Sequence, residues 1–399
     1  MLTMDKPRFV IKKNLQKSAV TGVLFSDVVT PDVLRDVCIR ITGKSDFAYD
    51  YVGNDYSDDF LEPSYNKGRI AIMHYAGIVH YITFSEKSIG GRNSSVQSVP
   101  TAFNMFYSNP YPNKMLHYYF LSFEGNAETD YQMLIYRLMA TVGFHFLNAE
   151  TALSTPITPF NSIEDIMFNR RVNAGRNRSN NSSYITKGDQ GEIEIYGKTY
   201  GANKYETSLM CYAASYLRRE GQSIELYEVL EGDLKELPAA SLQVIRQMGT
   251  IDVIPTDMTL EKTLFERQDS LRSPRYIYNL LERLGSKHCV LCDCQIPELI
   301  QGAHIWPVAE IKRERTMSYE EKLRCAIDGE NGLWLCENHH KMFDSNMISF
   351  NENGELIFPN GIERRHLRFI DRITPFKQLP DFVLTDRFLE YLWRRMQSA

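Results

Sequence analysis

The residues best suited to chemistry in this chain are cysteines and histidines gathered toward its C-terminal end. Five of the seven cysteines and four of the nine histidines lie between residues 288 and 340. Two pairs have the spacing of metal ligands, Cys289 with Cys292 and Cys336 with His339. Each pair places two soft donors on one tight turn, and two such turns facing each other make a closed tetrahedral zinc site. The sequence therefore predicts a zinc ion bound by these four residues.

Two further donors, His288 and Cys294, are spare ligands that could replace a member of the first pair. Because four protein ligands leave no position open for water, we expect the zinc to be structural. The plainer alternative is that the cysteines are small core residues and the histidines lie on the surface. Two matched pairs flanking one compact segment favour zinc.

Three more polar residues lie inside this segment and are not explained by the zinc ion: His304 in QGAHIWP, Asn331 at the start of NGLWLC, and His340 directly after His339. The pattern AHI-x-P followed by N-G-L-x-L-C-x-x-H-H-x-x-F-D resembles the HNH (ββα-metal) nuclease family. The resemblance is to the zinc-containing branch found in many restriction endonucleases, and it covers residues 286–360.

The resemblance implies a fold and a role for each residue. His304 would end one strand, Asn331 would begin the next, and His340 would lie on the following helix, so that all three meet in one cleft. His304 would be the general base, Asn331 would hold the loop that carries it, and His340 would bind a catalytic divalent metal, Mg²⁺ or Mn²⁺. The stretch ISFNENGELIF then predicts a hairpin with an Asn-Gly turn at Asn353 and Gly354.

The residue types suit phosphodiester hydrolysis in their own right. Hydrolysis needs a base with a pKa near neutrality, which imidazole offers, and a cation that stabilises charge developing on the leaving oxygen. One position departs from the family, because many members carry Asp or His just before the base and this chain has Ala303. Asp344 could supply the missing oxygen ligand, or it is a capping or salt-bridging surface carboxylate; both interpretations stay open.

The composition is that of a globular protein with two or three domains. The net charge of −5 and the pI near 6.0 confine any DNA-binding surface to a local basic patch. The N-terminal stretch lacks the apolar run of a signal peptide, and no segment has the apolar length of a membrane span. Cysteines assigned to metal indicate a reducing compartment, so we expect a cytoplasmic protein without membrane partners.

Residues 1–150 are expected to form a mixed α/β domain that recognises DNA. The patterns predict a hairpin at 69–84, a strand at 117–124 and a buried helix at 131–148. The polar, glycine-bearing loop at 87–100 carries Arg92, Asn93 and Gln97, whose side chains suit contacts with phosphates and base edges. An ordinary surface loop is the alternative.

Residues 151–285 are expected to form a middle domain that binds DNA or serves as a scaffold. Its Asn- and Ser-rich stretch at 169–191 is a candidate DNA clamp or a solvated linker, and it contains the cations Arg170, Arg171, Arg176, Arg178 and Lys187. A β-α-β unit is predicted at 192–229, and mainly helices at 237–284. Whether charged residues of this unit form a second active site is left open; they are Glu192, Glu194, Lys198, Lys204 and Glu206.

Taken together, the sequence predicts a mixed α+β protein of the α/β class whose residues 286–399 form a zinc-bound HNH nuclease domain with a closing helix. The leading hypothesis is a type II restriction-like endonuclease acting on double-stranded DNA. Because one HNH site cuts one strand at a time, double-strand cleavage would favour a homodimer. The alternatives are an anti-phage effector nuclease with a sensing front half and a non-catalytic zinc-ribbon module that binds DNA.

Overall fold

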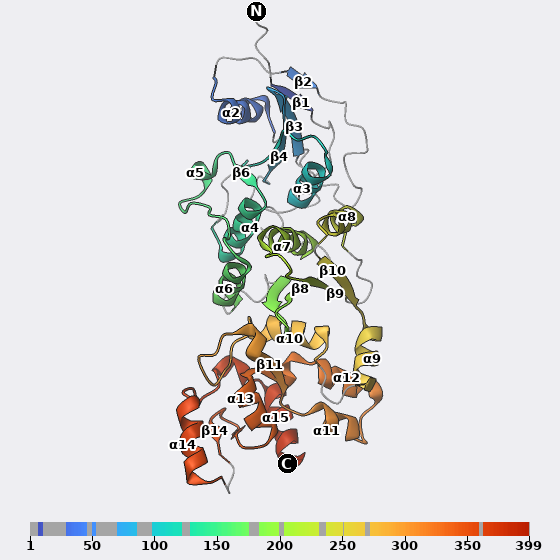
Figure 1. Cartoon of the computed structure of the whole chain (residues 1–399), viewed down its shortest axis with the longest axis vertical. Coiled ribbons are helices and arrows are strands. Elements are labelled where there is room, and N and C mark those ends of the chain that lie inside the picture. Colours follow the sequence, from blue (N-terminus) through green and yellow to red (C-terminus); the bar gives the residue numbers. More distant parts are fainter. Residues whose placement is uncertain are drawn as a thin grey trace, which may run out of the picture. The chain divides into compact units, whose positions relative to one another are not determined.

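The computed structural model of the chain, drawn in Figure 1, divides into two compact units. The first unit comprises Met1–Ile166, Thr199–Glu220 and Lys235–Asp252, and the second comprises Met167–Lys198, Gly221–Leu234 and Val253–Ala399. The structure describes residues 7–10, 29–45, 50–52, 70–85, 98–121, 128–174, 183–198, 203–230, 237–249, 251–267, 272–358 and 362–398. The expected α/β class is confirmed.

The first unit is built on a six-stranded sheet with the order β2-β1-β3-β4-β5-β6. Its strands are β1 (Arg8–Val10), β2 (Asp50–Val52), β3 (Ile70–Tyr75), β4 (Ile78–Phe84), β5 (Lys114–Tyr119) and β6 (Phe144–Phe146). The predicted hairpin is confirmed as β3 and β4, which pair antiparallel around Ala76 and Gly77, both at positive φ. A two-residue turn of this kind matches the twist of the strands.

Helices α2 to α8 complete the first unit, except that α6 crosses into the second. Their bounds are α2 (Pro31–Thr42), α3 (Val99–Ser108), α4 (Asp130–Thr141), α5 (Ala149–Ala152), α6 (Ile163–Ala174), α7 (Asn203–Leu217) and α8 (Ala239–Gln247). Helix α2 begins with a cap that is visible in the sequence, because Thr30 accepts from the Val33 amide and Pro31 occupies the first turn. The helix ends at Thr42, with Gly43 as its C-cap.

Two expectations for this unit had the wrong bounds. The predicted strand at 117–124 is β5, which begins at Lys114 and ends at Tyr119. The predicted helix at 131–148 ends at Thr141, because Gly143 takes a φ of 97° and Phe144–Phe146 pairs with β5 as a further strand. A short apolar run gives no periodicity by which a buried strand can be told from the last turn of a buried helix.

The second unit contains a four-stranded sheet with the order β10-β9-β8-β7. Its strands are β7 (Ser183–Lys187), β8 (Ile193–Lys198), β9 (Ile224–Val229) and β10 (Ile251–Thr256), the last crossing the boundary between the units. Strands β8 and β9 are parallel and joined in sequence through α7, as the β-α-β prediction required. Strand β10 lies inside the stretch expected to be mainly helical.

The region expected to carry the nuclease has a hairpin and a helix at its centre. Strand β11 (Ile300–His304) pairs antiparallel with β12 (Gly332–Cys336), and helix α13 (Glu337–Asp344) follows directly. The charged insert between the strands forms α11 (Val308–Arg313), α12 (Tyr319–Ile327) and the 3₁₀ turn η5 (Gly329–Asn331). The order strand, strand, helix is the one that the resemblance implied.

Helices on both sides in sequence complete the core of this region. The preceding ones are α9 (Met258–Arg267), α10 (Pro274–Leu284) and the 3₁₀ turn η4 (Pro297–Leu299). The following elements are the short hairpin β13 (Ser349–Phe350) and β14 (Leu356–Ile357), helix α14 (Arg364–Ile373), the 3₁₀ turn η6 (Asp381–Val383) and helix α15 (Asp386–Ser398). The hairpin turn is formed with Gly354 at a φ of 77°, as predicted, and α15 is the predicted closing helix. None of the helices in the described ranges combines the length and the apolar run that a membrane crossing needs.

Candidate active site and metal centre

The four predicted zinc ligands come together in the second unit. One donor atom from each of Cys289, Cys292, Cys336 and His339 lies within 4.8 Å of all the others. The Sγ atoms of Cys292 and Cys336 are 3.8 Å apart, and a tetrahedron with Zn–S bonds of about 2.3 Å has an edge of about 3.8 Å. The set therefore fits a tetrahedral zinc ion, and it is the only such group of three or more donors among the described residues.

The histidine of this cluster has a fixed orientation. His339 Nδ1 lies 3.4 Å from Cys289 Sγ and 3.1 Å from Cys336 Sγ, so Nδ1 is the ligand atom. Its Nε2 lies 3.0 Å from the Thr374 hydroxyl, which is the kind of outer partner that sets the tautomer of a metal-binding imidazole. The spare donors are not part of the cluster: the backbone carbonyl of Cys294 accepts from the Cys289 amide, and His288 Nδ1 lies 2.9 Å from the Ser286 carbonyl.

The thiols of the cluster influence one another strongly. The hydrogen bond between Cys289 and Cys336 is the main cause that lowers the pKa of Cys336 and raises the pKa of Cys289, so the two thiols do not lose their protons independently. A cation at the centre removes this dependence, since metal-bound cysteines are deprotonated.

His304, Asn331 and His340 occupy the places that the resemblance implied. His304 is the last residue of β11, Asn331 directly precedes β12, and His340 lies on α13 next to the cluster residue His339. The backbone pairs His304 with Gly332, one residue after Asn331. The sequence thus identified the elements that position these three residues.

His304 is held in one tautomer. Its Nε2 lies 2.9 Å from the Ala326 carbonyl oxygen, and because a carbonyl only accepts, Nε2 carries the proton and Nδ1 has the lone pair. Burial lowers the pKa of His304 to about 4, and the nearby charges of His340 and Arg272 act in the same direction. At neutral pH the imidazole is therefore uncharged and able to accept a proton at Nδ1.

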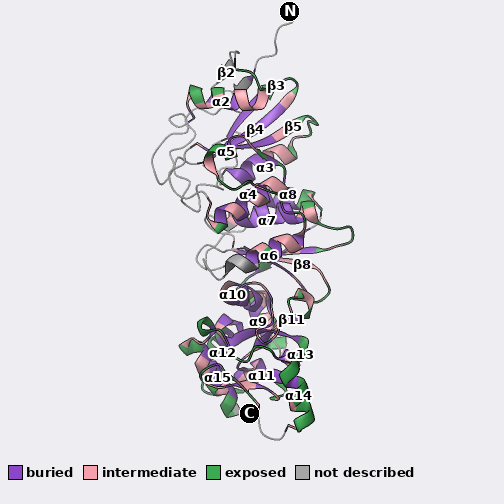
Figure 2. Cartoon of the chain, turned by 90° about the vertical axis from the view of Figure 1, so that its left-hand side faces the viewer, coloured by how far each residue is buried: buried purple, intermediate pink, exposed green. Residues whose placement is uncertain are grey.

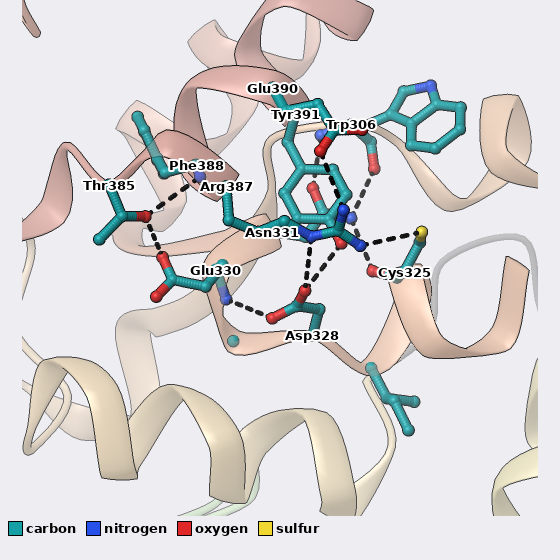
Figure 3. A network of polar contacts seen from close by, with 12 residues as sticks. Trp306, Cys325, Asp328, Glu330, Asn331, Thr385, Arg387, Phe388, Glu390 and Tyr391 are labelled. Atoms are coloured by element: carbon teal, nitrogen blue, oxygen red, sulfur yellow. Dashed lines mark hydrogen bonds and ion pairs between the residues drawn. The ribbon is translucent and has the colours of Figure 1, made fainter. Parts of the chain in front are cut away.

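Asn331 is completely buried and directs its amide at the loop that follows His304 (Figure 3). Its Oδ1 accepts from the Trp306 amide at 2.7 Å, and its Nδ2 donates to the Trp306 carbonyl at 3.1 Å and to the Cys325 carbonyl at 3.0 Å. The Asn331 carbonyl also accepts from the Ile305 amide at 3.0 Å. Asn331 thus holds the segment that follows β11 at Ile305 and Trp306, and it connects this segment to the end of α12 at Cys325.

The turn that presents Asn331 is itself held by the C-terminal helix. Asp328 caps η5 by accepting from the Glu330 amide, and Tyr391 of α15 donates to the same carboxylate at 2.8 Å (Figure 3). Thr385 donates to Glu330 at 2.6 Å. The closing helix is therefore part of the support of the site.

His340 and Asp344 lie one helical turn apart on α13, with Nδ1 and Oδ2 separated by 3.4 Å. Burial lowers the pKa of His340, so its ring favours the neutral form that binds metals. A site of this kind, with one imidazole and one carboxylate, fits a divalent cation that takes its other ligands from water and phosphate. Ala303 is buried in the core and pairs with Leu333, so that position brings no ligand.

The sequence did not point to helix α10 as part of the site. Tyr276 stacks on the His304 ring with centroids 4.0 Å apart and planes 12° from parallel. A Cβ on Gly302 would lie 2.6 Å from the Leu280 side chain, and one on Gly332 would lie 2.3 Å from the Tyr276 hydroxyl. The glycines before His304 and after Asn331 therefore allow α10 to lie directly against the hairpin.

Three arginines also support the site through contacts that are distant in sequence. Arg283 donates to the carbonyls of Gly329 and Gly332 at the two ends of the turn that holds Asn331. Arg395 of α15 is buried and donates to the carbonyls of Ile305 and Phe343, joining the end of β11 to α13. Arg272 hydrogen-bonds Gln301 of β11, and its charge lowers the pKa of both His304 and His340.

Most of the residues predicted to contact DNA lie outside the described residues. The two whose side chains are described, Arg170 and Lys187, contact other residues of the chain. Arg92, Asn93, Gln97, Arg176 and Arg178 lie outside the described residues, as does the side chain of Arg171. Arg170 is buried on α6, with its guanidinium over the Tyr184 ring at 5.9 Å, so it is not exposed to a phosphate here. Lys187 pairs with Glu298 at 3.3 Å.

Within the second unit, the charged residues of the β-α-β unit take part in separate contacts. Glu194 pairs with Lys287 at 3.5 Å, and Lys198 pairs with Glu282 of α10 at 3.3 Å. Glu192 accepts from the Gln190 amide and so closes a turn. Lys204 and Glu206 lie on α7 in the first unit. The two ion pairs attach β8 to α10 and to the start of the zinc segment, which is a scaffold role.

The comparison with protein families agrees with this geometry. Residues 289–351 match the HNH endonuclease family, less than a fifth of the chain. These residues contain β11, β12 and α13, together with the four clustered metal donors. The second unit therefore contains a segment that is similar to HNH endonucleases, and the four donors that could hold a metal ion lie within this segment. A comparison with curated proteins gives no match.

Proposed function

We propose that this protein is a restriction-type endonuclease that hydrolyses phosphodiester bonds of double-stranded DNA at its HNH module. The observation that carries the proposal is the state of His304, which is neutral, fixed in the Nε2–H tautomer and stacked on Tyr276, with Nδ1 as its basic atom. A neutral imidazole with one oriented lone pair is suited to take a proton from water, and this one lies at the end of the first strand of the segment that matches the family.

The residues of the module divide the work of hydrolysis. Nδ1 of His304 takes a proton from the attacking water, while the Ala326 carbonyl holds the ring through Nε2–H. Asn331 fixes the loop at Trp306 so that the ring keeps its direction. His340 and Asp344 would hold Mg²⁺ or Mn²⁺, which when bound stabilises the charge that develops on the leaving oxygen. The products would be a 5′-phosphate and a 3′-hydroxyl.

The Cys289, Cys292, Cys336 and His339 cluster would hold a structural zinc ion. The cluster joins the turn before β11 to the start of α13, so the metal fixes the two halves of the module against each other. Its four protein donors leave no place for water or substrate.

The remainder of the chain would supply recognition, with residues 1–150 and 151–285 as the expected recognition and scaffold regions. A module of this size has little surface with which to contact a long DNA site. A homodimer would place two such modules on the two strands of a palindromic site. A cytoplasmic location is part of this proposal.

The test compares wild type with His304→Ala on methylated and unmethylated plasmid and phage DNA, with Mg²⁺ or Mn²⁺. Discrete fragments that disappear in the variant support a restriction-type enzyme and allow its site to be mapped. The variant is expected to keep DNA binding, because His304 is assigned to the chemical step; if binding is lost as well, the histidine is structural.

Two other results would replace the proposal. A smear of fragments that depends on His304 would indicate a nonspecific effector nuclease. An absence of cleavage by the folded, zinc-loaded protein on every DNA would favour the zinc-ribbon binding module, for which Ala303 in place of an acidic residue or histidine is the best argument.

A further inference from the structure

Helix α14 is a basic and exposed helix that the proposed chemistry does not use. Between residues 363 and 379 the chain has five cationic side chains and two carboxylates, on a protein whose net charge is −5. The cationic residues are Arg364, Arg365, Arg368, Arg372 and Lys377, all of them exposed. Figure 2 shows α14 largely in the colour of exposed residues.

The arginines of α14 share one face. Arg364, Arg368 and Arg372 are spaced four residues apart, so they lie one above the other along the helix. Ile370 is the buried residue of α14, and at about 100° per residue it points away from this row. The helix is therefore attached to the protein by its apolar side and presents a row of guanidinium groups to solvent.

The row has cations available for a partner. Arg365 pairs with Glu363, Lys377 pairs with Asp371, and the Arg372 guanidinium lies over the Phe369 ring. Within the part of the chain that the structure describes, the side chains of Arg364 and Arg368 have neither an ion pair nor a hydrogen bond. Two exposed guanidinium groups that have no partner among the described residues are suited to contact an external anion.

Helix α14 is tied to the cluster of Cys289, Cys292, Cys336 and His339 by two contacts. Thr374 follows the last residue of α14, is buried, and binds Nε2 of the cluster residue His339. Two residues later, the Phe376 amide donates to the carbonyl of Leu291, which lies between Cys289 and Cys292. The same cluster holds α13, which carries His340, so α14 and the candidate catalytic helix share one rigid support.

We propose that α14 binds the phosphate backbone of duplex DNA through Arg364 and Arg368 and so positions the DNA on the HNH module. Its regular row of guanidinium groups fits a regular row of phosphates, and such contacts position a protein without reading sequence. The inference rests on the proposed function for the identity of the anion, since DNA is the polyanion on which an HNH nuclease acts.

The experiment measures DNA binding on a background that does not cut. Every protein carries His304→Ala, and binding of a fluorescent random-sequence DNA duplex is followed by anisotropy between 0.05 and 0.25 M KCl, about the range in which phosphate contacts dominate. The test variant adds Arg364→Gln and Arg368→Gln. The matched control adds Lys262→Gln and Arg267→Gln, two exposed cations of α9 in the same unit. Zinc content and circular dichroism show that each protein is folded.

Loss of two phosphate contacts should make the plot of log association constant against log salt concentration less steep by about 1.8. The affinity at 0.1 M salt should fall roughly 60-fold. The α9 control should bind like the background protein. An unchanged slope in the α14 variant, or an equal loss in both variants, overturns the proposal, because the effect would then be absent or due to net charge alone. Tighter binding of an RNA duplex of equal length, lost with the same substitutions, would overturn the choice of DNA.

The binding assay does not depend on cleavage, so the two proposals can fail separately. If the protein with His304 intact cuts DNA and the α14 variant still binds normally, the nuclease stands and the α14 interface is wrong. If the protein cuts nothing and the α14 variant has lost binding, the interface stands and the nuclease assignment is wrong.

Discussion

Replacing Asn331 by alanine should both destabilise the second unit and slow cleavage. The substitution removes three hydrogen bonds of 2.7–3.1 Å that the side chain makes with the backbone of Trp306 and Cys325. It leaves the β11–β12 pairing in place, since the backbone of Asn331 still accepts from Ile305. The loop that follows His304 is thus released without unfolding the hairpin.

The size of the effect follows from the burial of the side chain. Each hydrogen bond contributes about 1 kcal/mol net, and backbone groups left buried without a partner cost more, so the free energy of unfolding should fall by about 3–5 kcal/mol. If His304 is the general base, as proposed, its displacement by about 1 Å would lower kcat by roughly a hundredfold. DNA affinity should change little, because Asn331 is buried and does not reach the surface.

Both quantities can be measured in the second unit. All three tryptophans of the chain, Trp306, Trp334 and Trp393, lie in that unit, so tryptophan fluorescence during urea unfolding reports on it. Cleavage is followed as conversion of supercoiled plasmid. The control is Asn279→Ala, which removes a single bond to the Ile327 carbonyl in the same region and should cost about 1 kcal/mol with nearly normal cleavage.

Two results would refute the reasoning. Wild-type stability and rate in Asn331→Ala would mean that the loop needs no support from this residue. An equal loss of cleavage in Asn279→Ala would mean that the activity follows general stability and not the loop after His304.

Three further predictions follow from the site. Burial lowers the pKa of His304 to about 4, so kcat/KM should stay level from pH 8 down to about 5 and fall only at lower pH. The protein must be shown to retain zinc across this range. A fall in kcat/KM centred on the usual pKa of histidine, about 6.5, contradicts the assignment. Tyr276→Leu removes the ring stacked on His304 and should lower kcat roughly a hundredfold at unchanged DNA affinity. Tyr276→Phe keeps the ring and loses only the long hydroxyl contact with the Asn331 carbonyl at 3.5 Å, so it should cleave nearly as fast as wild type; equal activity of both variants would show that stacking is unimportant. Thr374→Val removes the partner of His339 Nε2 and should weaken zinc binding about 10- to 100-fold in competition with a chelator; unchanged affinity would deny that role.

The sequence by itself determined the four-donor cluster and the local motif of the module. The spacing of Cys289, Cys292, Cys336 and His339 predicted a four-donor cluster, and the structure brings these donors together. The places of His304, Asn331 and His340 on strand end, strand start and helix also followed from a local motif. Such features are readable because metal ligands and motif residues lie on short turns whose geometry depends on neighbouring residues in the chain.

Local patterns were less reliable where a partner far away in sequence decides the outcome. The helix predicted at 131–148 ends at Thr141 because β5 offers a place for one more strand. Strand β10 lies in a stretch expected to be helical because it joins the sheet of β9. Pairing between distant segments overrides local propensity, and a single sequence does not show it.

Only the tertiary structure decided how the site is supported. Tyr276 stacks on His304 from a helix that ends before the motif begins, and Arg395 reaches Ile305 and Phe343 from the C-terminal helix. The burial of Arg170 was equally invisible, since a cluster of arginines in the sequence looks the same whether a side chain faces solvent or a tyrosine ring. A motif specifies which atoms can react, but their pKa, tautomer and direction depend on burial and on contacts between residues that are distant along the chain.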